Sequence, residues 1–482
     1  MSGETAPALF CLFGATGDLA RRKILPALHK LHSEGAASNV YILGVTRTAD
    51  IDDTGFRGIA AEAVASGAQA GSVDAWAASR LYYQPIGDGT PDDYAALARR
   101  IEEIESRHVL SGNRVFYLAL PPAGFTDAAR GIAAVGLARS NGWSRLVVEK
   151  PFGRDLESAR ALNASLHEGW SEEQVYRIDH YLGKETVQNL LVFRFANAMF
   201  ESLWNRDRID SVQITVAEDL GIGDRAGYYD QAGAVRDMMQ NHLAQLLTLV
   251  AMEPPSRLDA AAIRSEKVKV LESVRPPEPS ELVRGQYARG TIEGKATAGY
   301  LEEKGVPAES DTATFAAIRL EIDNWRWLGV PFFLRTGKRL ASRVTEVVLN
   351  FREPPVALFE RFEACRPQSD TLVLRLQPDE GFILYFDVKK PGASLELERQ
   401  PLRFNYSEAF GPLPEAYETL LLDVLEGDQT LFVHSAEVEE AWRLFTPLLE
   451  SPSRLHPYPA GSWGPAEADH IMEGASLPWR NP

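Results

Sequence analysis

The stretch Ala8-Leu-Phe-Cys-Leu-Phe13, followed directly by Gly14-Ala-Thr-Gly17-Asp18-Leu19, decides the fold of this 482-residue chain. Six apolar residues predict a buried strand, and the two glycines predict a tight turn into a helix near Leu19 to His32. Backbone N–H groups and the positive end of a helix at such a turn can hold a pyrophosphate. The spacing is Gly-x-x-Gly and not the full dinucleotide fingerprint, so a plain glycine turn stays open as an alternative. We expect a nucleotide cofactor to bind at Gly14, Thr16, Gly17, Asp18 and Leu19.

Two kinds of pattern follow one another along the chain. From Ala8 to about Tyr176, short β-rich runs alternate with helical patterns, which is typical of βαβ units around a parallel sheet. From Ile209 onward, period-2 runs predict strands, among them SVQITVAE, TATFAAIRLEID, RVTEVVLNF, TLVLRLQ and GFILYFDVKK, and Pro378 to Gly381 predict an antiparallel turn. Long helical patterns around Asp230 to Met252 and Ser435 to Leu449 interrupt these runs. We therefore predict an α/β Rossmann domain at 1–178, followed by a large α+β domain with a mainly antiparallel sheet at 179–482.

The composition is that of an ordinary globular protein, with 45% hydrophobic and 24% charged residues. No run approaches the roughly 18 apolar residues of a membrane span, and the first residues lack the basic region and cleavage site of a signal peptide. The net charge of −17 opposes non-specific binding to nucleic acid or to an anionic membrane, so an anionic ligand must meet a local basic cluster. Two cysteines, Cys11 and Cys365, cannot build a disulfide framework or a four-ligand zinc site. We expect reduced thiols in a cytoplasmic protein.

Further candidates follow the predicted strands, at the sheet edge where open parallel sheets bind ligands. Arg47 and Thr48 end the second strand, and a basic residue there suits the 2′-phosphate of NADP, although an ordinary surface arginine remains an alternative. Pro121, in the sequence LPP, ends another strand and is expected beside the cofactor. Lys150, in the sequence EKP, can place one positive charge between cofactor and substrate, or it is merely solvated.

The segment RIDHYLGK, from Arg177 to Lys184, is unusually polar for a junction between domains. A helical turn would bring His180 and Lys184 onto one face as a phosphate-binding pair, with Asp179 pointing elsewhere. The alternative interpretation is the polar start of a helix between domains.

The segment DMMQNHLAQ, from Asp237 to Gln245, leads into an apolar helix. His242 is the candidate general base because imidazole titrates near neutral pH, and Asp179 could be the carboxylate that orients it. A hydrogen-bonded core histidine remains an equal alternative. Farther on, the run FFLRTGKR places three basic residues between Arg335 and Arg339, which predicts an anion subsite or a basic rim on an edge strand.

Taken in order, these motifs resemble the glucose-6-phosphate dehydrogenase family, from GATGDLARRK through LPP, EKPFG, RIDHYLGK, DMMQNHLAQ and LRTGK to AWRLFTPLL. RIDHYLGK is highly specific, whereas the glycine turn and EKP are shared with many oxidoreductases. The resemblance implies oxidation of β-D-glucose 6-phosphate to 6-phosphogluconolactone with NADP, the first step of the oxidative pentose phosphate pathway. It also implies a homodimer or homotetramer built through the sheet of the second domain.

The resemblance assigns a role to individual residues. It implies that His242 is the base and Asp179 its carboxylate partner. It implies substrate contacts from Lys150, His180, Tyr181, Lys184, Glu218, Asp237, Lys338 and Arg343, of which His180, Tyr181 and Lys184 look like the phosphate-binding group. Some relatives hold a second, structural NADP through basic residues after LRTGK. Val344 and Val348 stand at those positions here while Lys389 and Lys390 remain, so the resemblance leaves this second site open.

The chemistry requires one positioned base and no metal, because hydride leaves C1 of a hemiacetal more readily as its hydroxyl loses a proton. Two other functions stay open at this point. A sugar dehydrogenase of the glucose-fructose oxidoreductase type would also show the glycine turn and EKP, but would not need Lys184 for a phosphate. A non-catalytic sugar-phosphate sensor would form no NADPH and would be marked by a lost base, whereas His242 is present.

Overall fold

A computed structural model describes residues 5–65, 70–356, 358, 367–392, 395–450 and 453–482. The chain forms two compact units, and each is assembled from separate stretches of sequence. The first unit comprises Met1–Lys184, Arg257–Arg264 and Pro414–Glu439, and the second comprises Glu185–Ser256, Ser265–Leu413 and Glu440–Pro482. The division into domains at 178/179 stays a prediction, and no motif indicated that two later stretches return to the first unit.

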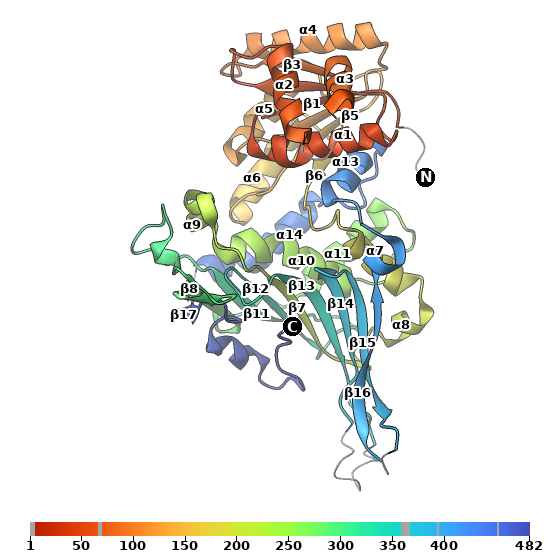
Figure 1. Cartoon of the computed structure of the whole chain (residues 1–482), viewed down its shortest axis with the longest axis vertical. Helices are drawn as coiled ribbons and strands as arrows, with labels where there is room; N and C mark the ends of the chain where they lie inside the picture. The colour runs from red at the N-terminus through yellow and green to blue at the C-terminus, as the bar shows by residue number, and fades with distance from the viewer. Residues whose placement is uncertain (1–4, 66–69, 357, 359–366, 393–394, 451–452) are drawn as a thin grey trace. The chain divides into compact units, whose positions relative to one another are not determined.

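The first unit is built on a six-stranded parallel sheet with the strand order β3-β2-β1-β4-β5-β6 (Figure 1). Its strands are β1 (Ala8–Phe13), β2 (Val40–Thr46), β3 (Leu81–Pro85), β4 (Arg114–Leu118), β5 (Ser144–Val148) and β6 (Val175–Arg177). This order is that of the doubly wound dinucleotide-binding fold, so the predicted Rossmann fold is confirmed. The central strand β1 is completely buried, as its six apolar residues predicted, and burial raises the pKa of the Cys11 thiol. Cys365 lies outside the described residues.

Helices cover both faces of this sheet. They are η1 (Ala20–Ile24, a π-helical turn), α1 (Leu25–Ser33), α2 (Asp53–Val64), α3 (Ala70–Arg80), α4 (Pro91–His108), α5 (Phe125–Ala134), α6 (Leu156–His167) and, from a later stretch, α13 (Ala416–Glu426). Helix α13 lies against α1 (Figure 1), where Glu418 pairs with Lys30 at 2.7 Å. Its residues Leu420 and Val424 are buried in the same core as Phe10 of β1.

The second unit is built on a nine-stranded sheet with the order β16-β15-β14-β13-β7-β12-β11-β8-β17 (Figure 1). Its strands are β7 (Ile209–Ala217), β8 (Leu282–Ala288), β11 (Phe315–Glu321), β12 (Pro331–Gly337), β13 (Val344–Phe351), β14 (Thr371–Gln377), β15 (Gly381–Lys389), β16 (Leu397–Asn405) and β17 (Leu455–Pro459). A small hairpin, β9 (Gly290–Ile292) with β10 (Lys295–Thr297), stands apart from it. Only the β7·β12 and β8·β17 pairs of the nine-stranded sheet are parallel, which confirms the predicted mainly antiparallel sheet.

The helices of the second unit include those that carry candidate residues. They are α7 (Glu185–Phe195), α8 (Ala198–Leu203), α9 (Ala226–Ala234), η5 (Val235–Leu243, a π-helix), α10 (Ala244–Ala251), α11 (Ala260–Ser273), α12 (Tyr406–Phe410) and α14 (Ser435–Glu450), of which α11 and α14 contribute residues to both units. Short 3-10 helices occur in both units. They are η2 (Pro122–Gly124) and η3 (Glu172–Gln174) in the first, and η4 (Gly223–Arg225), η6 (Pro279–Glu281), η7 (Tyr300–Glu302) and η8 (Ala466–Met472) in the second. The predicted helical patterns are confirmed at both places: α14 covers Ser435 to Leu449, and residues 230–251 are helical in α9, η5 and α10, with a break at Gly233.

Within the described part of the chain, no helix has both the length and the apolar character needed to cross a bilayer.

Candidate active site

The glycine turn lies at the carboxyl end of β1, beside the point where the strand order reverses between β1 and β4. Gly14 has a φ of +77°, and a Cβ there would lie 2.2 Å from the carbonyl oxygen of Ala119. The N–H of Gly17 donates to the carbonyl of Gly14 at 2.9 Å, which closes the turn. Thr16 and Leu19 are half-buried, and the exposed Asp18 pairs with Arg22 at 2.6 Å. Ligands of open parallel sheets bind at such a reversal of strand order, so this position favours a nucleotide over a plain turn.

Arg47 stands exposed immediately after β2. The backbone beside it is held, because the N–H of Thr48 donates to Thr46 Oγ1 at 3.3 Å and the hydroxyl of Tyr83 donates to the carbonyl of Thr48 at 2.5 Å. No ion pair of Arg47 is found among the residues that the structure describes. A guanidinium on a well-held strand end is therefore available to an anionic ligand.

Two more candidates follow β4 and β5 at the same edge of the sheet. Pro121 is exposed after β4, and Lys150 is half-buried after β5. The neighbour of Lys150, Glu149, is buried, and its Oε1 accepts hydrogen bonds from the hydroxyls of Tyr117 (2.6 Å) and Tyr417 (3.0 Å). Burial raises the pKa of Glu149. This buried carboxylate, which the sequence analysis did not single out, anchors the strand end that presents Lys150.

The segment after β6 does not form the predicted helical turn. Residues 180–183 form tight turns, and helix α7 begins only at Glu185. The physical reason is Asp179, whose Oδ1 accepts from the N–H of Tyr181 at 3.0 Å and so competes with helical hydrogen bonding. The turns still gather the candidate phosphate group, because the Tyr181 ring lies 4.4 Å from Lys184 Nζ and 5.1 Å from the His180 ring.

The turns that carry Asp179 and His180 are held from β6 by a buried ion pair. Arg177 is fully buried, and its guanidinium contacts both carboxylate oxygens of Glu172 at 2.7 and 3.1 Å and Asn163 Oδ1 at 2.9 Å. Burial acts to raise the pKa of Glu172, but the charge and hydrogen bonds of Arg177 outweigh it and bring that pKa to about 2. The first residue of RIDHYLGK is therefore structural.

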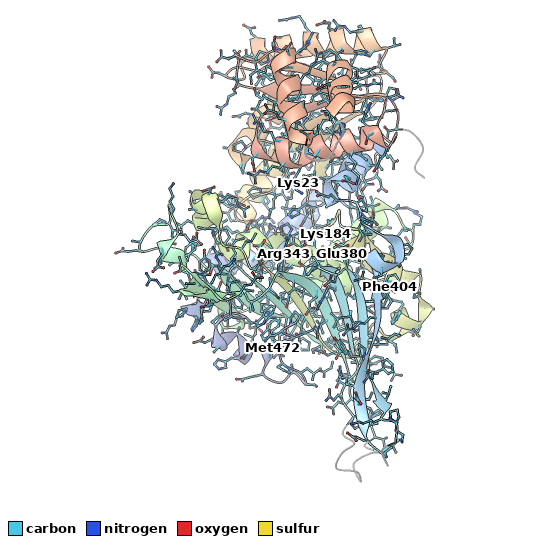
Figure 2. The ribbon with its side chains drawn as sticks, viewed as in Figure 1. Lys23, Lys184, Arg343, Glu380, Phe404 and Met472 are labelled. Atoms are coloured by element: carbon cyan, nitrogen blue, oxygen red, sulfur yellow. The ribbon has the colours of Figure 1, made fainter. Side chains whose placement is uncertain are left out.

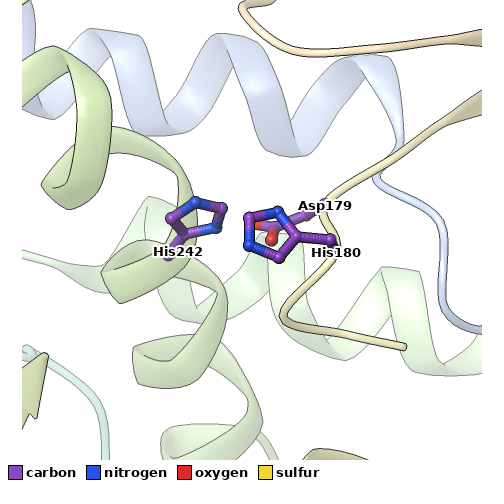
Figure 3. A group of neighbouring side chains, drawn as sticks. All are labelled: Asp179, His180 and His242. Atoms are coloured by element: carbon purple, nitrogen blue, oxygen red, sulfur yellow. The ribbon is translucent and has the colours of Figure 1, made fainter. Parts of the chain in front are cut away.

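His242 lies on η5 and is 1% exposed. Figure 3 shows its side chain on this helix, and shows Asp179 and His180 on the non-helical segment that follows β6. In a π-helix each N–H bonds five residues back, so Asp237 and His242 lie near each other along η5. Asp237 is buried as well, and the hydroxyl of Tyr228 donates to it at 3.4 Å. Such stretches of π-helix occur frequently at functional sites.

Glu218 and Lys338 are brought together by the parallel pair β7 and β12. Ala217 and Gly337, the last residues of these strands, are register partners. Glu218 and Lys338 come directly after them, so both lie at the carboxyl ends of the two strands. The carboxylate of Glu218 and the ammonium of Lys338 form an ion pair, and Lys338 Nζ lies 5.0 Å from the centre of the Tyr229 ring. Arg343 is exposed just before β13 (Figure 2), whose first residue, Val344, also pairs with Ala217.

The three basic residues around LRTGK have separate surroundings. Strand β12 is an interior strand of the sheet, so the interpretation as a basic rim on an edge strand is wrong. Arg335 is buried between Trp463 and Trp479 and donates to the carbonyl of Arg480 at 2.9 Å. Arg339 approaches Glu303 at 3.5 Å. Of the three, only Lys338 lies with other candidate substrate contacts.

The positions considered for a second NADP differ in character. Val344 and Val348 are buried within β13, whereas Lys389 and Lys390 are exposed at the end of β15, where Lys390 pairs with Glu396 at 3.3 Å. The side chain of a buried valine cannot bind a phosphate. Of the four positions considered for a second NADP, Lys389 and Lys390 are therefore the two that offer a positive charge.

Comparison with known proteins gives a consistent result over nearly the whole chain. The family model described as "Glucose-6-phosphate dehydrogenase, NAD binding domain" matches residues 11–189, and "Glucose-6-phosphate dehydrogenase, C-terminal domain" matches residues 191–480. The chain is 46% identical to a glucose-6-phosphate 1-dehydrogenase of Treponema pallidum, covering 100% of this chain and 96% of that protein. It is 44% identical to the enzyme of the same name from Aggregatibacter actinomycetemcomitans, covering 98% and 97%.

Solved structures resemble the whole chain as well. A glucose-6-phosphate dehydrogenase in complex with its substrate glucose 6-phosphate has a TM-score of 0.91 at 35% identity, with complete coverage of both chains. A glucose-6-phosphate 1-dehydrogenase from Mycobacterium avium has a TM-score of 0.86 at 37% identity, covering 99% of each chain.

Proposed function

The chain belongs to the glucose-6-phosphate dehydrogenase family, and from this membership we propose that it oxidises β-D-glucose 6-phosphate to 6-phosphogluconolactone with transfer of hydride to NADP+. The family resemblance given by the motifs is thereby confirmed. The observation that carries the proposal is the match along both units, including the full-length likeness to a structure solved with glucose 6-phosphate. It favours this activity over a dehydrogenase of the glucose-fructose oxidoreductase type. The presence of His242 argues against a sensor that has lost its base.

The cofactor residues of the first unit fit NADP+, the cofactor of this family. The absence of a Cβ at Gly14 lets the chain turn at the carboxyl end of β1, where backbone N–H groups can hold the pyrophosphate. Arg47 is placed to bind the 2′-phosphate, with Thr48 next to it after β2. Pro121 follows β4, on the other side of β1. Bound NADP+ supplies the nicotinamide that accepts the hydride from C1 of the sugar.

The substrate phosphate is bound by His180, Tyr181 and Lys184. Lys184 contributes a positive charge, and the imidazole and phenol contribute hydrogen bonds, which together offset the repulsion between a dianion and a chain of net charge −17. Glu218, Asp237 and Lys338 contact the sugar, with Arg343 beside them and Lys150 between sugar and cofactor. The Glu218–Lys338 ion pair supports this role, because it keeps both side chains oriented before substrate binds.

His242 accepts the proton of the C1 hydroxyl as hydride departs. The carboxylate of Asp179 orients the imidazole and stabilises the imidazolium that forms. The burial of both side chains supports these roles, because each charge would act in a medium of low dielectric constant.

The protein acts as a homodimer or homotetramer that associates through the sheet of the second unit, in the cytoplasm. Exposed apolar side chains at the edge of that sheet support such an interface, since Leu402 of β16 is 58% exposed and Phe410 of α12 is 73% exposed. The net charge of −17 argues against nucleic acid as a partner.

The experiment is a spectrophotometric assay of NADPH formation, with glucose 6-phosphate or glucose and with NADP+ or NAD+. We expect activity to depend on the phosphate, and equal activity with both sugars would contradict the proposal. His242→Asn should lower kcat by about 10²–10⁴ with little change in the substrate Kd, and Asp179→Asn should lower it less. His470→Asn, an exposed histidine on η8, is the matched control. A folded His242→Asn protein with normal kcat would refute the role of this base.

A further inference from the structure

The helix that carries Asp237 and His242 begins at a break in the backbone. Gly233, near the end of α9, has φ 64° and ψ 176°, a region that is essentially restricted to glycine. Two backbone groups beside this break bond to a distant loop. The N–H of Ala234 donates to the carbonyl of Ala313 at 2.8 Å, and the hydroxyl of Thr312 donates to the carbonyl of Asp230 at 2.6 Å.

The side chain of Asp230 holds the same loop. Its carboxylate oxygen Oδ1 accepts from the hydroxyl of Ser310 at 2.5 Å and from the hydroxyl of Tyr300 at 3.0 Å. The loop is therefore bonded to the residues on both sides of Gly233, through side chains and through backbone.

Packing holds this turn on one side, where Gly233, Ala234 and Val235 are buried, but not on the other. A cavity of about 210 Å³ is lined by residues 230–236 of the break and by residues 311–313 of the loop. Close-packed side chains would hold a helix end by contact alone, but here part of the surface of the turn faces open space. The hydrogen bonds to the loop hold the turn in addition to the contacts of its buried residues.

The other end of the loop is bonded to the turn that carries Lys338. The carbonyl of Thr314 accepts from the N–H of Lys338 at 2.9 Å. Tyr458 donates to the carbonyl of Lys338 at 2.6 Å, and its hydroxyl lies 2.9 Å from Thr314 Oγ1. Both Thr314 and Tyr458 are fully buried. One short segment thus connects the start of η5 to the end of β12.

We propose that the segment Ser310–Thr314, fastened through Asp230 and Thr312, is a positioning element that sets η5 relative to the Glu218–Lys338 pair. This inference rests on the proposed function, in which η5 presents Asp237 and His242 and the pair contacts the sugar. Asp230 acts through η5 and is a positioning residue. A displacement of about 1 Å in a reacting group can lower a rate by about a hundredfold, so loss of the fastening should affect turnover first.

The test compares Asp230→Ala, which removes the acceptor for Ser310 and Tyr300, with Asp230→Asn, which retains an acceptor oxygen. Asp230→Ala should lower kcat by about ten- to a hundredfold and leave KM for NADP+ unchanged, because the proposed cofactor residues belong to the first unit. Asp230→Asn should recover most of the rate, and Thr312→Val should lose less than Asp230→Ala. The matched control is Asp224→Ala, an exposed carboxylate on η4 of the same stretch of chain.

A second measurement does not depend on activity. Amide hydrogen exchange in residues 235–243 should become faster in Asp230→Ala and stay unchanged in Asp224→Ala. Unchanged exchange in Asp230→Ala would overturn the role of the positioning element, whatever the activity of the wild-type protein. A normal kcat in Asp230→Ala would also overturn it. If Asp230→Ala fails to fold, normal kcat in both Thr312→Val and Ser310→Ala would overturn it equally. Inactivity of the wild-type protein on glucose 6-phosphate, with faster exchange in the variant, would instead contradict the proposed function.

Discussion

Replacing Glu172 by Gln should destabilise the protein markedly, because it leaves the buried guanidinium of Arg177 without its negative partner. The side chain of Arg177 is 0% exposed and that of Glu172 is 16% exposed, so water cannot substitute for the lost carboxylate. Glu172 also accepts a hydrogen bond from the N–H of Ser435 at 2.9 Å, at the start of α14.

The magnitude follows from the pKa of Glu172. A fall from 4.5 to about 2 corresponds to roughly 3 kcal/mol, at about 1.4 kcal/mol for each tenfold change in the acid dissociation constant. Removal of one partner from a buried ion pair typically costs about 3–5 kcal/mol, so the two values agree. A loss of about 3 kcal/mol should lower Tm by roughly 6–12 °C for a unit of this size.

The stabilisation by Glu172 should decrease as the pH falls. Because the pKa of Glu172 is lower in the folded protein than in the unfolded chain, its stabilisation is fully present above pH 4.5. It is lost as the pH falls from 4.5 toward 2, with about 1.4 kcal/mol gone by pH 3.5. The difference between wild type and Glu172→Gln should therefore shrink on acidification.

The assay is thermal denaturation of wild type, Glu172→Gln and Glu173→Gln at pH 7 and at pH 3.5. Glu173 is the matched control, since it is the exposed neighbour in the same 3-10 turn, η3. Equal Tm values for the two variants at pH 7 would refute the contribution of the buried pair. A difference that persists undiminished at pH 3.5 would show that the charge of Glu172 is not its cause.

Two further predictions concern binding. Arg47→Ala should weaken NADP+ by about ten- to a hundredfold and NAD+ far less, since a charge-assisted contact is worth roughly 1.5–3 kcal/mol. Fluorescence titration with both cofactors measures this, with the exposed Arg99→Ala as control, and equal losses for the two cofactors would contradict the 2′-phosphate role. Lys184→Ala should raise KM for glucose 6-phosphate strongly and change activity toward glucose little. Steady-state kinetics with both sugars measures this. If the variant loses as much activity toward glucose as toward glucose 6-phosphate, Lys184 does not bind the phosphate.

Much of the first unit could be predicted because strands of a parallel sheet are buried on both faces and appear as continuous apolar runs. ALFCLF is such a run, and the structure buries all of it. The edge strands of the second unit carried no such signal. Strand β17, with the sequence LHPYP, contains two prolines, and β16 contains Pro401 among charged residues, as suits strands that border the sheet.

The candidate residues were found where a local motif carries them, as with Lys338 in LRTGK or Lys150 in EKP. Residues that act through distant partners gave no signal. Glu149 meets Tyr417 across 268 positions, and Asp230 meets Ser310 across 80. The turn at Asp179 and the helix break at Gly233 were also missed, because side-chain hydrogen bonds and a special backbone conformation override helical periodicity at both places.

The return of residues 414–439 to the first unit has a consequence for biosynthesis. A ribosome releases the six parallel strands early. Helix α13 completes their core only after more than four hundred residues have been made, with the buried side chains of Leu420, Leu421, Val424 and Leu425. Until then the nascent chain exposes apolar surface that the finished protein covers, which is the condition under which chaperones bind partly folded chains. Most of the second unit is synthesised in that interval and its last stretch, Glu440–Pro482, follows Glu439, so both units are completed only near the end of translation.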